Sequence, residues 1–211
     1  MDRIEQIDTF SRITSVSRET IIGLEKYEDI LIKANRTLNL IGKSTENKIW
    51  ERHILDSFQV IDYIDKNDIT LTDLGSGAGF PGLIIAIAAK DRKIPLKINL
   101  IDKSPKKIKF LEATIKKLNL NVQVICKNIF EDEKKIMGDV FVARAFKPLP
   151  VILKLINNQA PNFKKIFIFL GKTGESELLE ASKIWNIEYK QRVSVTSSDS
   201  IIIEINKLKK K

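Results

Sequence analysis

Three scarce features of the sequence exclude several classes of protein. Among 211 residues there is one cysteine, Cys126, and one histidine, His53, so neither an intrachain disulfide nor a zinc site of the His/Cys type can form. No apolar run approaches the ~20 residues that a membrane-spanning helix needs. The charged N-terminus does not resemble a signal peptide. We therefore expect a cytoplasmic protein that binds no metal and does not enter a membrane.

Positive charge is in excess. Lys and Arg total 36 against 27 Asp and Glu, which gives a net charge of +9, while the hydrophobic and charged fractions are those of an ordinary globular protein. Such a surplus suits a polyanionic partner, because basic side chains that neutralise phosphates release the counterions condensed on them. A lysine-rich but merely solvated surface explains the same charge. Composition alone does not choose between the two.

The sequence pattern predicts two parts and a short tail. Residues 1–65 are expected to form a helical extension, with apolar side chains at helical spacing near 21–34 and a second helix from Ser44 or Thr45. Residues 66–206 alternate short strands with helices, which is typical of βαβ units and a parallel sheet. A turn cluster, Thr196–Ser200, separates the last two strands, so we expect an antiparallel hairpin there. Residues 207–211 are expected to be a basic tail, whose lysines are either a second candidate for binding RNA or disordered.

The expected elements of the second part follow from these patterns. The predicted strands are Thr70–Leu74, Lys97–Ile101, Val122–Cys126, Asp139–Ala143, Lys164–Leu170, Glu188–Val195 and Ile201–Ile205. The predicted helices are Pro81–Lys90, Pro105–Leu118, Leu149–Asn157 and Gly174–Trp185.

A glycine-rich loop, LTDLGSGAGFPG, follows the first strand and predicts a cradle for a nucleotide-type ligand. Its glycines allow a positive φ or a close approach of the main chain to a ligand. The GxGxxG match at 77–82, with Asp102 20 residues beyond Gly82, fits a dinucleotide such as NAD. Asp73 favours S-adenosylmethionine instead, because it lies at the strand end, where it can face the methionine ammonium. The closing hairpin also favours S-adenosylmethionine, by analogy of fold.

Two further positions are expected near that ligand. Asp102 ends the second strand, where its carboxylate can accept both ribose hydroxyls; its structural alternative is a cap for the helix that follows. Asn128, Ile129 and Phe130 follow the third strand, and this loop either frames an adenine or is an ordinary connection.

Five segments resemble the RsmG family, the 16S ribosomal RNA guanine-N7 methyltransferases once called glucose-inhibited division protein B. They are NRTLNLIG (35–42), WERHILDS (50–57), DLGSGAGFPGL (73–83), LIDKSPKKIKFL (100–111) and ARAF (143–146). The resemblance implies a class I S-adenosylmethionine-dependent methyltransferase: an α/β, Rossmann-like, seven-stranded, mostly parallel sheet with a closing antiparallel hairpin. It also implies methyl transfer to N7 of a guanine in 16S ribosomal RNA or a small-subunit particle. We expect a monomer.

The resemblance carries the family's cofactor contacts onto Gly75, Phe80, Ile129, Phe130 and Arg144. With the residues argued above, the predicted cofactor set is Asp73, Gly75, Gly77, Gly79, Phe80, Asp102, Ile129, Phe130 and Arg144. The chain departs from the family at two places. Ile84 stands where a proline is usual, and FLGKTGE replaces the usual Lys-Gly after the fifth strand, which leaves the role of Lys172 open.

Arg144 is the candidate for positioning the target base, because it follows the fourth strand, where class I methyltransferases place that base. Its guanidinium suits guanine O6 and N7, the cofactor carboxylate or an RNA phosphate, and a surface ion pair is the structural alternative. His53 and Asp56 either belong to the cleft floor, orient the cofactor loop, or are only packed. Few catalytic groups are needed, since neutral guanine N7 already has a free lone pair and transfer depends mainly on alignment.

A lysine cluster after Asp102 is the candidate RNA-binding surface. It contains Lys103, Lys106, Lys107 and Lys109, and its alternative is a solvated helix face. Two other functions remain open from the residues themselves: a non-catalytic basic RNA- or nucleotide-binding module, and an NAD-dependent oxidoreductase.

Overall fold

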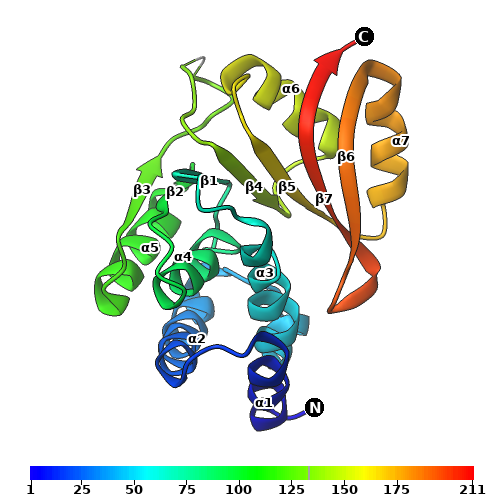
Figure 1. Cartoon of the computed structure of the whole chain (residues 1–211). Coiled ribbons are helices and arrows are strands. Elements are labelled where there is room, and N and C mark those ends of the chain that lie inside the picture. Colours follow the sequence, from blue (N-terminus) through cyan, green and yellow to red (C-terminus); the bar gives the residue numbers. More distant parts are fainter. Residues whose placement is uncertain (133) are drawn as a thin grey trace.

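A seven-stranded sheet forms the centre of the protein (Figure 1). The structure, a computed structural model, describes residues 1–132 and 134–211. The strands are β1 (Thr70–Leu74), β2 (Lys97–Asp102), β3 (Val122–Cys126), β4 (Val140–Arg144), β5 (Lys165–Leu170), β6 (Trp185–Ser194) and β7 (Ser197–Lys210), in the order β3-β2-β1-β4-β5-β7-β6. Strands β1 to β5 are parallel, and β7 is antiparallel to both β5 and β6. The predicted sheet and its closing hairpin are confirmed.

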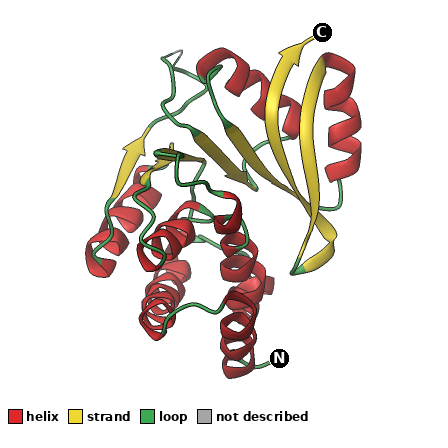
Figure 2. Ribbon diagram, viewed as in Figure 1, coloured by secondary structure: helices red, strands yellow, loops and turns green. Residues whose placement is uncertain are grey.

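Helices cover both faces of this sheet (Figures 1 and 2). One hydrophobic cluster holds buried side chains of α1 (Arg3–Thr14), α2 (Arg18–Leu38), α4 (Gly82–Asp91) and α5 (Pro105–Leu118). A second cluster holds those of α6 (Leu149–Gln159) and α7 (Gly174–Ile184). The N-terminal helices therefore share a core with the sheet and do not form one of their own.

The closing hairpin differs from the prediction at its turn and at its end. The turn is Val195–Thr196 alone, because Ser197–Ser200 already belong to β7. The basic tail expected at 207–211 is not separate from the sheet, and the disordered alternative does not hold for its residues up to Lys210. Strand β7 continues to Lys210, with Leu208 opposite Ile187, and both of these side chains pack against the second cluster. Apolar Leu208 therefore keeps the lysine-rich end in the sheet.

The N-terminal extension contains the predicted helix near 21–34, which is α2, and a second helical segment that begins at Lys43 and is made of successive short helices. These are a 3-10 helix (Lys43–Lys48), a π-helix (Trp50–Leu55), a short α3 (Asp56–Phe58) and a 3-10 turn (Ile61–Tyr63). The side-chain oxygen of Asn35 accepts the backbone N–H groups of Leu40 (2.7 Å) and Ile41 (2.9 Å). These bonds fix the chain as it leaves α2 and give the NRTLNLIG segment a structural role.

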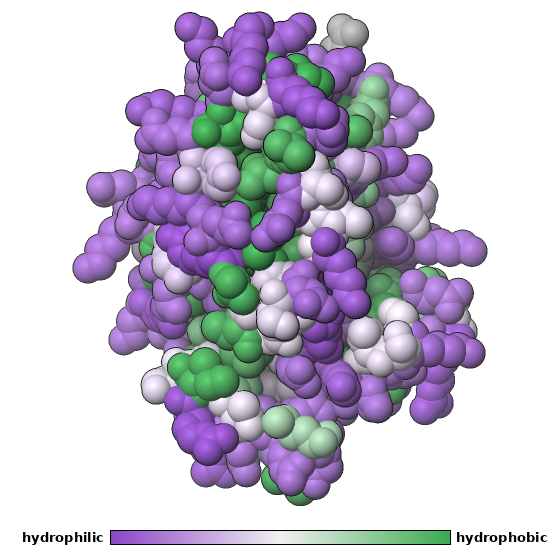
Figure 3. Space-filling view, turned by 90° about the vertical axis from the view of Figure 1, so that its right-hand side faces the viewer, coloured by the Kyte–Doolittle hydropathy of each residue, from purple (hydrophilic) through white to green (hydrophobic). Residues whose placement is uncertain are grey.

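Polar side chains cover most of the face that includes β6 and α7, with hydrophobic groups in smaller patches between them (Figure 3). Most of β6 is exposed along its length. Within the described residues, no helix combines the length and apolarity that spanning a bilayer requires.

Candidate active site

A cleft of about 460 Å³ lies at the carboxyl ends of β1 and β2. Ligands of open α/β sheets bind at this edge, where the strand order reverses, here between β1 and β4. Four predicted cofactor residues lie together in its wall: Gly75, Asp102, Ile129 and Phe130. The remaining lining residues are Ile101, Lys103, Lys107, Lys127, Asn128, Ala145, Phe146, Lys147 and Val151.

The glycine loop reaches the cleft through Gly75. This residue has a φ of +74°, and a β-carbon added to it would collide with the ring of Phe146. Its N–H and that of Ser76 both donate to the carbonyl of Ile101, each at 2.9 Å, so the loop is tied to the end of β2. Gly77 and Gly79 also have positive φ values, of 57° and 102°, but they shape the loop without lining the cleft.

Asp102 connects the glycine loop to the turn before α5. One carboxylate oxygen accepts the N–H of Gly77 (3.0 Å) and the other accepts the N–H of Ser104 (2.8 Å). The N-cap residue of α5 is Ser104, so Asp102 stabilises the preceding turn and does not cap the helix. Each oxygen of an ionised carboxylate has two lone pairs, so Asp102 keeps the capacity to accept hydroxyl groups from the cleft.

Asp73 lies away from the cleft, fully buried under the glycine loop. Its Oδ2 accepts the N–H of Gly82 (2.9 Å), the first residue of α4, and its Oδ1 has no hydrogen-bond partner among the described residues. Burial raises the pKa of this carboxyl from 3.8 to about 7. The carboxyl therefore satisfies the start of α4, and its predicted contact with a ligand ammonium stays a prediction.

Arg144 is held by the N-terminal extension and does not line the cleft. Its Nε lies 3.0 Å from Asp56 Oδ2, and its Nη2 donates to the carbonyl of Arg52 (2.5 Å). The guanidinium is largely buried, with 17% of the side chain exposed, and burial lowers its pKa. The ion pair is thus an internal one and not the surface pair considered from the sequence. A role for Arg144 toward cofactor, base or phosphate stays a prediction.

His53 contacts Arg144 and is a neutral side chain. Its Nδ1 lies 3.1 Å from Arg144 Nη1, which can only donate, so Nδ1 is the acceptor and Nε2–H donates to the hydroxyl of Thr45 (2.8 Å). Burial, together with the neighbouring Arg144 and Arg52, lowers the pKa of His53 to about 3. Both ring nitrogens are satisfied, which favours the packed role over a catalytic one.

Side chains of the N-terminal extension also contact the glycine loop directly. The ring of Phe80 stacks on His53, with centroids 4.9 Å apart, and makes a T-shaped contact with Tyr27, with centroids 5.5 Å apart. The hydroxyl of Tyr27 donates to the carbonyl of Ala78 (2.7 Å). Phe80 is therefore part of the support of the loop, and its predicted contact with the cofactor stays a prediction.

Asp56 joins this assembly to the hairpin. Its Oδ1 accepts the hydroxyls of Ser194 (2.8 Å) and Thr196 (3.2 Å), while its Oδ2 pairs with Arg144. We call Asp56, Arg144, His53, Ser194 and Thr196 the clamp. It fastens the end of β4, the π-helix, α3 and the β6–β7 turn together, which gives the RHILDS segment a physical role.

Several cleft residues were not predicted from the sequence. Phe146 stacks on Phe130 with centroids 5.8 Å apart, and Lys147 Nζ lies 5.6 Å from the centre of the Phe130 ring. Phe146 lies in the ARAF segment, so the family resemblance was a signal that could have placed it in the site. No sequence signal pointed to Lys127 or Val151.

Of the four predicted RNA-binding lysines, Lys103 and Lys107 line the cleft, whereas Lys106 and Lys109 are exposed on α5. Lys172 is exposed, 3.5 Å from Asp199.

The described residues contain no group of three or more His, Cys, Asp or Glu side chains that could hold a metal ion.

The strand order, the antiparallel β7 and the cleft beside β1 define a class I S-adenosylmethionine-dependent methyltransferase fold. Two solved structures share it. A TehB-like S-adenosylmethionine-dependent methyltransferase from Corynebacterium glutamicum has a TM-score of 0.52 and 15% identity, over 72% of this chain and 87% of that one. The 16S rRNA methylase RmtB has a TM-score of 0.54 and 12% identity, over 91% and 76%.

Sequence comparison gives the family. The model of the family described as rRNA small subunit methyltransferase G matches residues 21–204. A Pelagibacter ubique protein named ribosomal RNA small subunit methyltransferase G is 42% identical over 93% of each chain. The chain belongs to the rRNA small subunit methyltransferase G family, as the sequence motifs predicted. This membership does not favour the oxidoreductase or the non-catalytic binding module.

Proposed function

We propose that this protein transfers the methyl group of S-adenosylmethionine to N7 of a guanine in 16S ribosomal RNA. The observation that carries the proposal is the meeting of Gly75, Asp102, Ile129 and Phe130, distant in sequence, in one cleft of a chain from this family. In this proposal the protein acts as a monomer in the cytoplasm, on 16S rRNA either free or in the small-subunit particle.

The residues of the cleft fit S-adenosylmethionine. Gly75 has no β-carbon, so no side chain of its own separates its main chain from the cleft. Its positive φ is one that glycine adopts without strain. Asp102 lies where it can accept ribose hydroxyls, and the exposed ring of Phe130 offers an apolar face to an adenine. When bound, S-adenosylmethionine supplies an electrophilic methyl group on a sulfonium.

The protein's own contribution to the reaction is alignment. Guanine N7 attacks through an existing lone pair, so no side chain has to remove a proton first. The clamp holds the end of β4 and the glycine loop in fixed positions, so that cofactor and base can meet in one orientation. Lys103, Lys107 and Lys147 place positive charge around the cleft, where RNA phosphates would approach.

Calorimetry tests the cofactor assignment directly. S-adenosylmethionine and its demethylated product should each bind at one site, and NAD should not bind. Saturable NAD binding without S-adenosylmethionine binding would reverse the assignment. A Gly75→Val variant is a poor probe here, because its β-carbon would collide with Phe146 and disturb the fold as well.

A further inference from the structure

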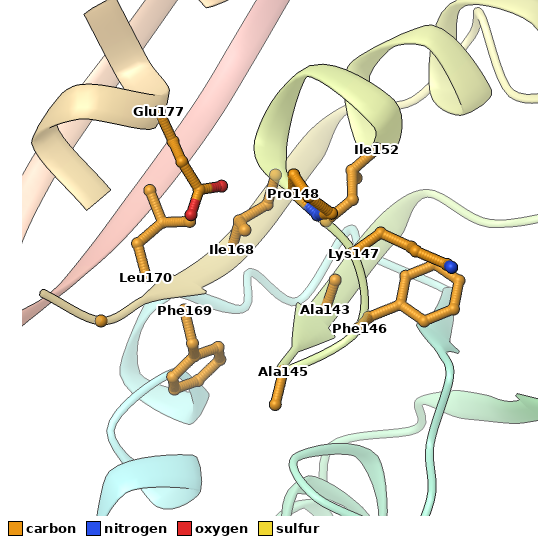
Figure 4. Close-up of a pocket in the computed structure, with 11 residues that line it drawn as sticks. Ala143, Ala145, Phe146, Lys147, Pro148, Ile152, Ile168, Phe169, Leu170 and Glu177 are labelled. Carbon is orange, nitrogen blue, oxygen red and sulfur yellow. The ribbon is translucent and has the colours of Figure 1, made fainter. Parts of the chain in front are cut away.

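A second cavity, of about 300 Å³, lies beside the cofactor cleft (Figure 4). The two cavities have three lining residues in common, Ala145, Phe146 and Lys147, which follow β4. The rest of the second cavity is lined by Ala143, Pro148, Ile152, Ile168, Phe169, Leu170, Gly171 and Glu177. This volume is at the low end for a small-molecule site and suits a single flat ring system. A base placed there would lie next to the cofactor cleft, because Ala145, Phe146 and Lys147 border both cavities.

Glu177 is the one carboxylate among the lining residues of the second cavity. Its Oε2 accepts the N–H of Leu149 (2.7 Å) and its Oε1 accepts the hydroxyl of Thr173 (2.8 Å). These bonds fix the orientation of the carboxylate. Since each oxygen has a second lone pair, both remain able to accept another hydrogen bond. Figure 4 shows Glu177 across the cavity from Ala145 and Lys147.

We infer that the second cavity binds the target guanine and that Glu177 determines the specificity for it, an inference that rests on the proposed function. Guanine presents two adjacent donors, N1–H and the N2 amino group, which match the two oxygens of one carboxylate. Adenine and cytosine place an acceptor beside their donor, and uracil has one donor alone. Only guanine therefore satisfies both oxygens of Glu177.

The same contact sets the orientation of the base. In a purine, N7 lies on the side opposite the N1 and N2 edge. A guanine held by Glu177 on α7 thus turns N7 toward Ala145 and Lys147, the side on which the cofactor cleft adjoins this cavity. Phe169 and Phe146 are half-buried and contribute apolar surface to the cavity. Enzymes that act on a base take it out of the stack into such a pocket.

The test uses the full-length protein and 16S rRNA in which the mapped target nucleotide is either guanosine or inosine, which lacks the N2 amino group. We expect wild-type kcat/KM to be at least tenfold higher for guanosine, the size of effect that one hydrogen bond to a charged group produces. In Glu177→Gln, the kcat/KM for guanosine should fall at least tenfold and the guanosine-to-inosine ratio should approach one. The Gln side chain can still bond Leu149 and Thr173, so the fold should persist.

Glu175→Gln is the matched control, because Glu175 is exposed on the same first turn of α7 and does not line the cavity. This variant should keep the wild-type ratio, and both variants should keep wild-type affinity for S-adenosylmethionine. A wild-type enzyme that does not distinguish the two RNAs overturns the inference, even if Glu177→Gln is unstable. So does a folded Glu177→Gln that keeps the wild-type ratio. No methylation of guanosine RNA by the wild type would instead contradict the proposed function itself.

Discussion

Asp102 connects three parts of the site, since it bonds the glycine loop and the turn before α5 and borders the cofactor cleft. Replacing it by alanine should lower the affinity for S-adenosylmethionine at least tenfold, about 1.4 kcal/mol, because the charge-assisted hydrogen bonds to the ribose can no longer form. Calorimetry gives the affinity, and thermal melting gives the decrease in stability from removing the two hydrogen bonds to the backbone. A lower melting temperature with unchanged affinity would mean that Asp102 supports the loop and does not bind ribose.

Asp73 should make stability depend on pH. Its folded pKa is raised from 3.8 to about 7 by burial, so the native state binds more protons than the unfolded state between these values. Stability from this group is present at low pH and is lost as pH rises through about 7, at up to about 1.4 kcal/mol per pH unit. His53 acts in the opposite direction, because its pKa is lowered to about 3.

Comparison with Asp73→Asn isolates the Asp73 effect, since the contribution of His53 cancels in the difference. Urea unfolding at pH 5, 6 and 7 should show wild type losing stability relative to the variant as pH rises. A difference that stays constant over this range would show that the carboxyl titrates normally in the folded protein.

At the scale of single residues, the sequence best predicted those site residues whose signal lies in a short stretch of neighbouring sequence. The spacing of Asp102 from the glycine loop predicted two residues that do line one cleft, Gly75 and Asp102. The partners of Arg144 were not predictable in this way. His53 and Asp56 lie about 90 positions earlier in the chain, and only packing of the extension on the sheet brings them together.

Among the elements, the clamp is the most sensitive connection, because it fastens the π-helix and α3 to β4 and to the hairpin. Asp56→Ala leaves the largely buried Arg144 without its carboxylate, and should reduce the free energy of unfolding by about 3–5 kcal/mol. Asp62→Ala is the control, since it breaks a more exposed pair with Arg92 and should cost about 1 kcal/mol or less. Urea unfolding measures both. Equal effects would mean that the clamp contributes no more than a surface pair.

The element boundaries show which ends of helices and strands can be predicted from hydrophobic periodicity and which cannot. Pro105 and the apolar stripe of α5 predicted its limits, Pro105–Leu118, because both signals lie within the helix. The end of β7 was missed because four lysines in 207–211 suggested a solvated tail. In an exposed hairpin the lysines can point to solvent, while Leu208 alone provides the apolar contact.

At the scale of the whole molecule, we expect the excess positive charge to bind RNA through the lysines around the cleft. Neutralising Lys103, Lys106, Lys107 and Lys109 to Gln should weaken RNA binding and reduce its salt dependence by about 0.7–0.9 units of log–log slope for each phosphate that these lysines neutralise in the wild type. Cofactor affinity is measured in parallel, because Lys103 and Lys107 also line the cleft. Lys116 and Lys117, exposed at the far end of the same helix, form the control pair and should leave the slope unchanged. An unchanged slope in the fourfold variant would mean that RNA binds elsewhere.

The identity of the methylated atom tests the central claim most directly. The protein is incubated with S-adenosylmethionine labelled in its methyl group and with 16S rRNA or small-subunit particles. The RNA is then treated with borohydride and aniline, which cleave at N7-methylguanosine. We predict label in 16S rRNA and cleavage at a single guanosine that carries it. Absence of label, or label in a nucleotide that resists cleavage, would contradict the account.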